Sequence, residues 1–184
     1  MNKVYFCNNG FFDPRAMLTF GVSVKDEGSI GYFGTGFKYA IAIILRNGGS
    51  ITIRSGDDVY DFKKVTEIIR DKEVDLIYCN GENAGFTTHM GINWKSWMAC
   101  RELYSNCIDE GGKVNECGGD FDTVIEVNHP EIYEAYLNTD SYFIGDDTPL
   151  VSGIHADIHR KRSAFVYYKG VAVYPANTFF TYNI

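Results

Sequence analysis

Three oxygen-bearing side chains, Glu102, Asn106 and Asp109, lie four and three residues apart in the stretch WMACRELYSNCIDEGG, from Trp97 to Gly112. On an α-helix these spacings place all three on one face. The opposite face would carry Trp97, Cys100, Leu103, Tyr104 and Cys107. The stretch is therefore predicted to be an amphipathic helix, ended by its two glycines. Its polar stripe holds two acids and an amide but no lysine, which favours a functional site over the common alternative of a solvated face.

A glycine-rich turn precedes a second predicted helix. Gly31, Gly34 and Gly36 lie in the segment GSIGYFGTG, and the strongly apolar run FKYAIAIILR follows directly. Glycines at the start of a helix let backbone N–H groups approach an anion closely, and the helix dipole favours negative charge there. An ordinary loop that leads into a helix is the alternative. Lys38 could reach a bound phosphate or face solvent, and the sequence favours neither.

Together the two stretches resemble motifs of the GHKL ATPases, the superfamily of gyrase B subunits, heat-shock chaperones, histidine kinases and MutL. The pattern R-E-L-x-x-N-x-x-D is similar to the family's N-box, and I-G-x-F-G-x-G-F is similar to its G2 box. The resemblance implies that Glu102 is a general base for water and that Asn106 is a ligand of Mg²⁺. It also implies that ATP is contacted by the other matched or adjacent positions: Gly31, Gly34, Gly36, Phe37, Lys38 and Asp109.

The turn after the first predicted strand matches a third family motif in part. In the G1 box, D-x-G-x-G, the aspartate accepts a hydrogen bond from the adenine amino group. Here the segment is NNGFF: Asn8 stands in place of the aspartate, Gly10 matches, and Phe12 replaces the second glycine. An amide oxygen can accept the same bond, without charge and more weakly. If the amide of Asn8 also presents its donor, guanine or another ligand is an alternative. Thr123, in the strand after the N-box helix, is also among the predicted nucleotide-binding residues.

The order of the motifs differs from the family. There the N-box precedes the G1 and G2 boxes, whereas here it follows them. This order resembles a circular permutation of the nucleotide-binding fold. A site depends on which residues converge in space, so a permuted order can retain it. The longer phrases around the G2 box and the N-box are also similar to uncharacterised GHKL-like ATP-binding proteins of bacteriophages, which implies a viral source.

Composition bounds the remaining possibilities. With 184 residues, 45% of them hydrophobic, the chain is predicted to form one domain over residues 1–184 with a substantial core. The net charge of −7 argues against nucleic acid or an anionic membrane as a partner. The five cysteines show no C-x-x-C spacing, so neither a zinc site nor a disulfide framework is predicted. Neither a signal peptide nor a membrane-spanning run is recognised, so a cytoplasmic location is expected, in the host if the source is viral.

The secondary-structure pattern predicts an α+β fold. Strands are predicted at residues 4–7, 50–54, 59–62, 121–127 and 178–182, and paired strands at 64–70 with 74–79 and at 164–168 with 171–174. A helical turn is an alternative for 64–70, and 141–144 fits a brief strand. Helices are predicted at 13–21, 36–47, 97–110 and 129–137, and loops at 81–93 and 145–162. The predicted architecture is a two-layer, Bergerat-like sandwich, with helices 36–47 and 97–110 on one face of a mostly antiparallel sheet.

Three functions are compatible with these features. The first is an ATP-binding protein that hydrolyses ATP slowly with Mg²⁺, slowly because no transducer domain is expected to follow. The second is a nucleotide-dependent switch without hydrolysis, which acts on a host or phage protein, for example in counter-defence. The third is a GHKL fold that has lost nucleotide binding. The sequence leaves the oligomeric state open.

Overall fold

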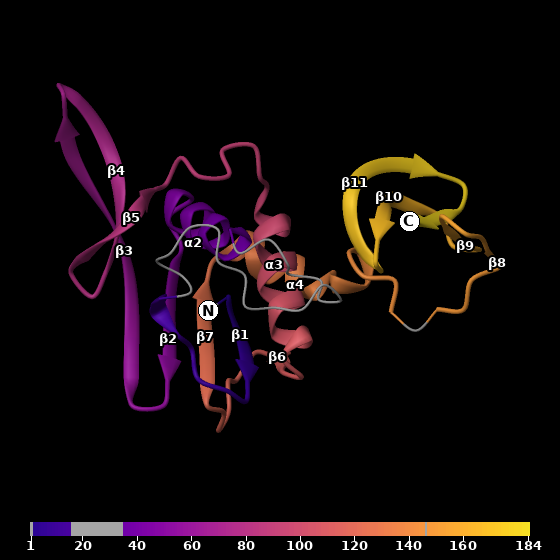
Figure 1. Ribbon diagram of the computed structural model, residues 1–184, viewed down its shortest axis with the longest axis horizontal. Helices are drawn as coiled ribbons and strands as arrows, with labels where there is room; N and C mark the ends of the chain where they lie inside the picture. The colour runs from indigo at the N-terminus through magenta and orange to yellow at the C-terminus, as the bar shows by residue number, and fades with distance from the viewer. Residues whose placement is uncertain (1, 16–34, 146) are drawn as a thin grey trace. The chain divides into compact units, whose positions relative to one another are not determined.

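The computed structural model describes residues 2–15, 35–145 and 147–184 (Figure 1). These residues combine α-helices with two sheets whose strands are mostly antiparallel, in agreement with the predicted α+β class. They separate into two compact units, Met1–Tyr136 and Leu137–Ile184, where the sequence predicted one domain over 1–184. The boundary between the units falls at Leu137, the last residue of a helix. A helix end has no linker-like composition, so the sequence does not mark this boundary. The helix predicted at 13–21 begins as expected at Pro14 and Arg15, and its remainder lies outside the described residues.

The first unit is built on a seven-stranded antiparallel sheet in the order β5-β4-β3-β2-β7-β1-β6 (Figure 1). Its strands are β1 (Lys3–Asn8), β2 (Ser50–Ser55), β3 (Asp58–Ile69), β4 (Lys72–Cys79), β5 (Glu82–Thr87), β6 (Lys113–Asn115) and β7 (Thr123–Asn128). β7 pairs with β1 on one side and with β2 on the other. Three segments that are distant in the sequence therefore form the centre of the sheet.

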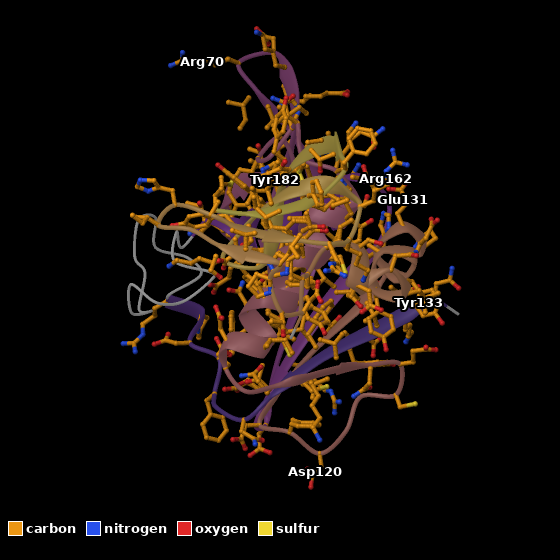
Figure 2. All side chains as sticks on the ribbon, turned by 90° about the vertical axis from the view of Figure 1, so that its right-hand side faces the viewer. Arg70, Asp120, Glu131, Tyr133, Arg162 and Tyr182 are labelled. Carbon is orange, nitrogen blue, oxygen red and sulfur yellow. The ribbon has the colours of Figure 1, made fainter. Side chains whose placement is uncertain are left out.

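The long hairpin of β3 and β4 corrects two details of the prediction. β3 runs unbroken through both predicted strands, so the helical alternative for 64–70 is wrong. Its turn holds Arg70 and Asp71 at φ angles of 48° and 63°, the left-handed values of a tight hairpin turn. Figure 2 shows Arg70 at the tip of this hairpin. The predicted loop 81–93 is also wrong in part, because β5 forms there and pairs with β4.

Two helices pack against each other and against this sheet. They are α2 (Gly36–Arg46) and α3 (Ser96–Asp109), and both confirm the predicted spans to within one or two residues. α2 contacts β2 and β3, while α3 contacts β1 and β6. The buried cross-strand row Val4, Val127 and Ile51 supplies part of the apolar surface of the sheet. Each fully buried aliphatic side chain contributes roughly 1.5–3 kcal/mol, so packing is the main force that holds the helices in place.

The predicted apolar face of α3 is confirmed in its centre. Cys100, Leu103 and Cys107 are buried, and Trp97 and Tyr104 are half-buried. α2 buries every residue from Ala40 to Leu45, so its side chains are covered around almost the whole helix. The Arg46 guanidinium at its end donates to the carbonyl oxygens of Thr88, at 2.6 Å, and Met90, at 3.2 Å. These bonds tie the end of α2 to the loop after β5.

Helix α4 (Pro130–Leu137) confirms the span predicted at 129–137 and begins with a buried histidine cap. The His129 Nδ1 atom accepts hydrogen bonds from the backbone N–H of Glu131, at 3.1 Å, and of Ile132, at 3.4 Å. A side-chain acceptor in this position satisfies donors that the first helical turn leaves open. Because Nδ1 must stay unprotonated to accept, this cap requires a neutral imidazole.

The second unit holds a five-stranded sheet in the order β11-β10-β12-β9-β8. Its elements are η1 (Thr139–Ser141), β8 (Val151–Ser152), β9 (Asp157–His159), β10 (Ser163–Tyr168), β11 (Val171–Thr178) and β12 (Thr181–Asn183). The predicted hairpin of β10 and β11 and the last strand are confirmed. The strand predicted at 141–144 is wrong, since only Phe143 forms an isolated bridge there. Short β8 and β9 interrupt the predicted loop at 145–162.

No helix within the described residues combines the length and the apolar character that crossing a membrane requires.

The turn after α3 is predicted to tolerate alanine at Gly111 better than at Gly112. A Cβ on Gly112 would lie 2.3 Å from the Cys7 carbonyl oxygen and 2.7 Å from that of Cys107, and both are backbone atoms. Gly111, at φ 68°, has open space around it. Gly112→Ala should lower the free energy of unfolding by about 2–3 kcal/mol, and Gly111→Ala by about 1 kcal/mol. Urea unfolding of both variants measures this, and equal losses would contradict the close approach.

The cap on α4 predicts a pH dependence of stability. Burial lowers the pKa of the His129 imidazole, and the smaller effect of Glu131 opposes it. The unfolded chain therefore binds a proton below about pH 6.5, where the folded chain resists it, and the free energy of unfolding should fall as the pH drops through this range.

His129→Asn keeps a capping side chain but removes this titration, so its stability should fall less between pH 7.5 and pH 5. Urea unfolding at several pH values measures the difference. His89→Asn, at an exposed histidine, is the matched control. The same slope in wild type and His129→Asn would refute the assignment.

Candidate functional site

The predicted catalytic glutamate lies against the first residue of α2. A Cβ added to Gly36 would lie 2.2 Å from both Cδ and Oε1 of Glu102, so the carboxyl group occupies the space that any larger residue would fill. The glycine of the G2-like turn and the glutamate of the N-box-like helix therefore meet. Because the start of a helix carries partial positive charge, it favours a carboxylate or another anion in this position.

Asn106 lies one helical turn after Glu102 and bonds to it. The Asn106 Nδ2 atom donates to Glu102 Oε1 at 3.2 Å. Since a carboxylate oxygen accepts, the amide nitrogen faces Glu102 and the amide oxygen takes the other branch of the planar group. Both side chains are half-buried, whereas Asp109, one turn further on, is exposed. The predicted stripe is thus present, with its first two members joined.

The burial of Lys38 rules out one of the two positions that the sequence left open, a solvent-facing side chain or one that reaches a phosphate. Lys38 is only 1% exposed, so the solvent-facing alternative is wrong. Burial lowers the pKa of its ammonium group below the ordinary value, because desolvation disfavours the charged form. The neighbouring Phe37 is half-buried, and its ring centroid lies 6.0 Å from that of Phe12. This contact connects the start of α2 with the turn that follows β1.

Three polar residues form a row across the central strands. The strand register aligns Asn8 of β1 with Thr123 of β7, and Thr123 with Ser55 of β2. All three are buried, with exposures of 7%, 3% and 5%. Directly opposed residues of antiparallel strands share a face, and the next buried rows on these strands are apolar. The row therefore places polar groups at the end of an otherwise apolar surface.

The row anchors the turn around Gly10. The Thr123 hydroxyl donates to the Gly10 carbonyl oxygen at 2.6 Å and lies 3.0 Å from the Ser55 hydroxyl. The Gly10 N–H donates to Asp122 Oδ2 at 2.9 Å, and the Phe12 N–H donates to Ser55 Oγ at 2.8 Å. The side chains of Thr123 and Asp122 thus fix both backbone groups of Gly10, and Ser55 fixes the backbone N–H of Phe12.

Asn8 has a partner at the end of α3. Its Nδ2 atom donates to Glu110 Oε2 at 2.7 Å. Glu110 is the C-cap residue of α3 and follows Asp109, and the last turn of this helix contains no basic residue. Two acids at the negative end of a helix dipole are unfavourable by roughly 0.3–1 kcal/mol each, so helix stability does not account for them.

The structure thus brings most of the predicted residues into two linked groups. Gly36, Glu102 and Asn106 form one, and Asn8, Gly10 and Thr123 form the other. Phe37 joins them through Phe12, while Gly31 and Gly34 lie outside the described residues. The sequence analysis missed Ser55, Asp122 and Glu110. The strand register reveals Ser55, and the hydrogen bond from the Gly10 N–H reveals Asp122. Glu110 directly follows the N-box pattern and was visible as a neighbouring acid.

Within residues 2–15, 35–145 and 147–184, no group of three or more His, Cys, Asp or Glu side chains is placed to hold a metal ion. The second unit contains a cavity of about 250 Å³ whose lining includes two acids and two bases, Asp140, Asp147, Lys161 and Arg162. None of the predicted site residues lines this cavity.

No family model, curated protein or solved structure matches the chain.

The anchor of the Gly10 turn can be tested with Thr123→Val, which keeps the shape of the side chain and removes the hydroxyl. The Gly10 carbonyl oxygen and the buried Ser55 hydroxyl each lose a partner, so the free energy of unfolding should fall by about 1–3 kcal/mol. Thr66→Val is the matched control, because the Thr66 hydroxyl donates to Asp75 in an exposed position. Chemical denaturation measures both, and equal effects would contradict a buried polar row.

Proposed function

We propose that the first unit is a circularly permuted GHKL-type domain with a Bergerat-like fold, which binds ATP with Mg²⁺ and hydrolyses it slowly. The observation that carries the proposal is the contact between Glu102 and Gly36. The two motifs that resemble the N-box and the G2 box were identified separately, far apart in the sequence, and in the reverse of the family order. Their contact is what a shared nucleotide site requires, and the antiparallel sheet beneath α2 and α3 is compatible with this fold.

The two groups of residues suit the two ends of a nucleotide. Both lie along α3, where Glu102 and Glu110 are eight residues, or about 12 Å, apart along the helix axis. The group at Gly36 offers a helix start, which suits phosphates. The group at Asn8 offers a buried amide, which suits a base edge. An elongated ligand with its base near Asn8 and its phosphates near Gly36 would contact both groups.

Asn106 and Asp109 suit the Mg²⁺ that ATP carries. Mg²⁺ prefers oxygen ligands and usually takes one or two from the protein, with the remainder from phosphates and water. The bond from Nδ2 to Glu102 leaves the Asn106 amide oxygen on the other branch, and an oxygen is the atom such an ion needs. Asn106 would therefore hold Mg²⁺, with Asp109 one turn away. Bound there, the metal would neutralise charge on the phosphates.

Glu102 is the proposed general base. Its carboxylate lies at the start of α2 and is held by the Asn106 amide, so it is positioned to take a proton from a water molecule beside a bound phosphate. The backbone N–H groups at the start of α2 would stabilise the negative charge of the phosphates. In related ATPases a transducer domain supplies a phosphate-sensing lysine. Turnover by the first unit alone is therefore expected to be slow.

Calorimetric titration with ATP, with and without Mg²⁺, and an assay of phosphate release test these roles. Asn106→Ala should weaken binding about 10–100-fold when Mg²⁺ is present and much less in EDTA, because it removes a metal ligand. Glu102→Gln should bind ATP normally and release phosphate at least about 100-fold more slowly. Gly36→Ala should also slow release, because its methyl group displaces the Glu102 carboxylate.

Glu73→Gln, an exposed change on β4, is the charge-matched control and should behave as wild type. Binding without phosphate release in wild type would replace the ATPase with a nucleotide-dependent switch that acts on a protein partner. No binding of ATP, ADP or GTP at millimolar concentration would refute both.

A further inference from the structure

The hydrogen bond between Asn8 and Glu110 fixes which atom of the Asn8 amide faces which way. Asn8 is 7% exposed, and its contact with Glu110 Oε2 is 2.7 Å long. A carboxylate has acceptors only, so the atom of Asn8 that faces it must be the nitrogen. The amide oxygen then takes the other branch of the planar group. Without such a partner, rotation about the last side-chain torsion would exchange nitrogen and oxygen at almost no cost in shape.

The polar groups next to Asn8 in the row bond to partners other than its side chain, so Glu110 orients the Asn8 amide. The Thr123 hydroxyl is bonded to the Gly10 carbonyl oxygen and lies 3.0 Å from the Ser55 hydroxyl. The Ser55 hydroxyl in turn accepts from the Phe12 N–H. Among the described hydrogen bonds, the one to Glu110 is thus the contact that orients the Asn8 amide. It also gives a reason for an acid at the end of α3, where the helix dipole disfavours one.

The orientation of the amide decides between two kinds of base. A purine with an amino group at position 6 offers a donor there and needs an acceptor from the protein, whereas a purine with a carbonyl at that position needs a donor. With Nδ2 held by Glu110, Asn8 presents its oxygen to the first kind. The second kind would bring two acceptors together, which leaves both unpaired and costs binding free energy.

We propose that Glu110 is a positioning residue that orients the Asn8 amide and so selects adenine nucleotides over guanine nucleotides. The inference rests on the proposed nucleotide binding and adds a determinant of its base specificity. It predicts that discrimination between ATP and GTP depends on a residue that need not touch the base.

Competition titrations with ATP and GTP on four proteins test the inference: wild type, Glu110→Ala, the double variant Asn8→Asp/Glu110→Gln, and the charge-matched control Glu73→Gln. Wild type and control should prefer ATP. In Glu110→Ala the amide is free to turn, so the preference for ATP over GTP should fall about tenfold or more. The double variant exchanges the donor and the acceptor of the bond. Its introduced glutamine must donate to its introduced aspartate, which again presents an acceptor to the base, so the preference should return.

The Asn8 side-chain amide signals in NMR spectra, recorded without nucleotide, test the bond separately. In wild type we expect one of the two amide protons to be shifted downfield and protected from exchange by its bond to Glu110, and both features should be lost in Glu110→Ala. If ATP binds but its preference over GTP is the same in wild type and Glu110→Ala, this inference is overturned and the proposed function stands. If the NMR bond is present but neither nucleotide binds, the proposed function fails and the role in base selection fails with it.

Discussion

The pairing register of β1, β7 and β2 is the constraint on which the candidate site depends. Side chains alternate between the two faces of a strand, so a slip of one residue in β7 would turn Thr123 to the opposite face. The Gly10 turn would then lose its anchor. Apolar side chains prevent such a slip, because Val127 lies between Val4 and Ile51 in a row that is completely buried. The buried apolar row thus stabilises the strand register, and this register places the polar row of Asn8, Thr123 and Ser55.

Two close contacts at glycines place α3 on this frame. Gly36 lets the start of α2 approach the middle of α3, and Gly112 lets the turn after α3 lie against the Cys7 carbonyl of β1. The first glycine is next to a flexible side chain, so a methyl group there would displace a functional group more than it would unfold the protein. The second is next to backbone, so a methyl group there would strain the fold. The same residue type thus serves function in one position and stability in the other.

Sequence periodicity was sufficient for the helices and the central strands, because their burial follows from local patterns. α2 and α3 and the strand at 121–127 have clear apolar spacing. Sequence periodicity failed for β5, which contains Asn83 and Gly85 and is a strand only because it pairs with β4. Periodicity also left the exposure of Lys38 undecided, since burial around a whole helix depends on the elements that pack against it. Ser55 and Asp122 were missed for a related reason: their role exists only once distant strands are paired.

The order of the motif-like segments and the presence of Asn8 each have a physical explanation in this structure. The described parts of these segments lie on or beside elements whose place is set by pairing or packing with distant segments, so the order of the segments along the chain matters little to the proposed site. A similar argument applies to charge. The GHKL family, whose motifs these segments resemble, has an aspartate where this chain has Asn8, so the negative charge is missing from the residue proposed to meet the base.

Glu110 places a carboxylate one hydrogen bond away from that residue, at 2.7 Å from the Asn8 amide nitrogen. Charge and acceptor are then divided between two side chains, of which one is buried and the other exposed. A neutral amide costs less to bury than a carboxylate, and the charge remains where water can solvate it. The division has a consequence that a single aspartate would not have: base selection depends on a second residue, because an amide can turn and a carboxylate presents acceptors in every orientation.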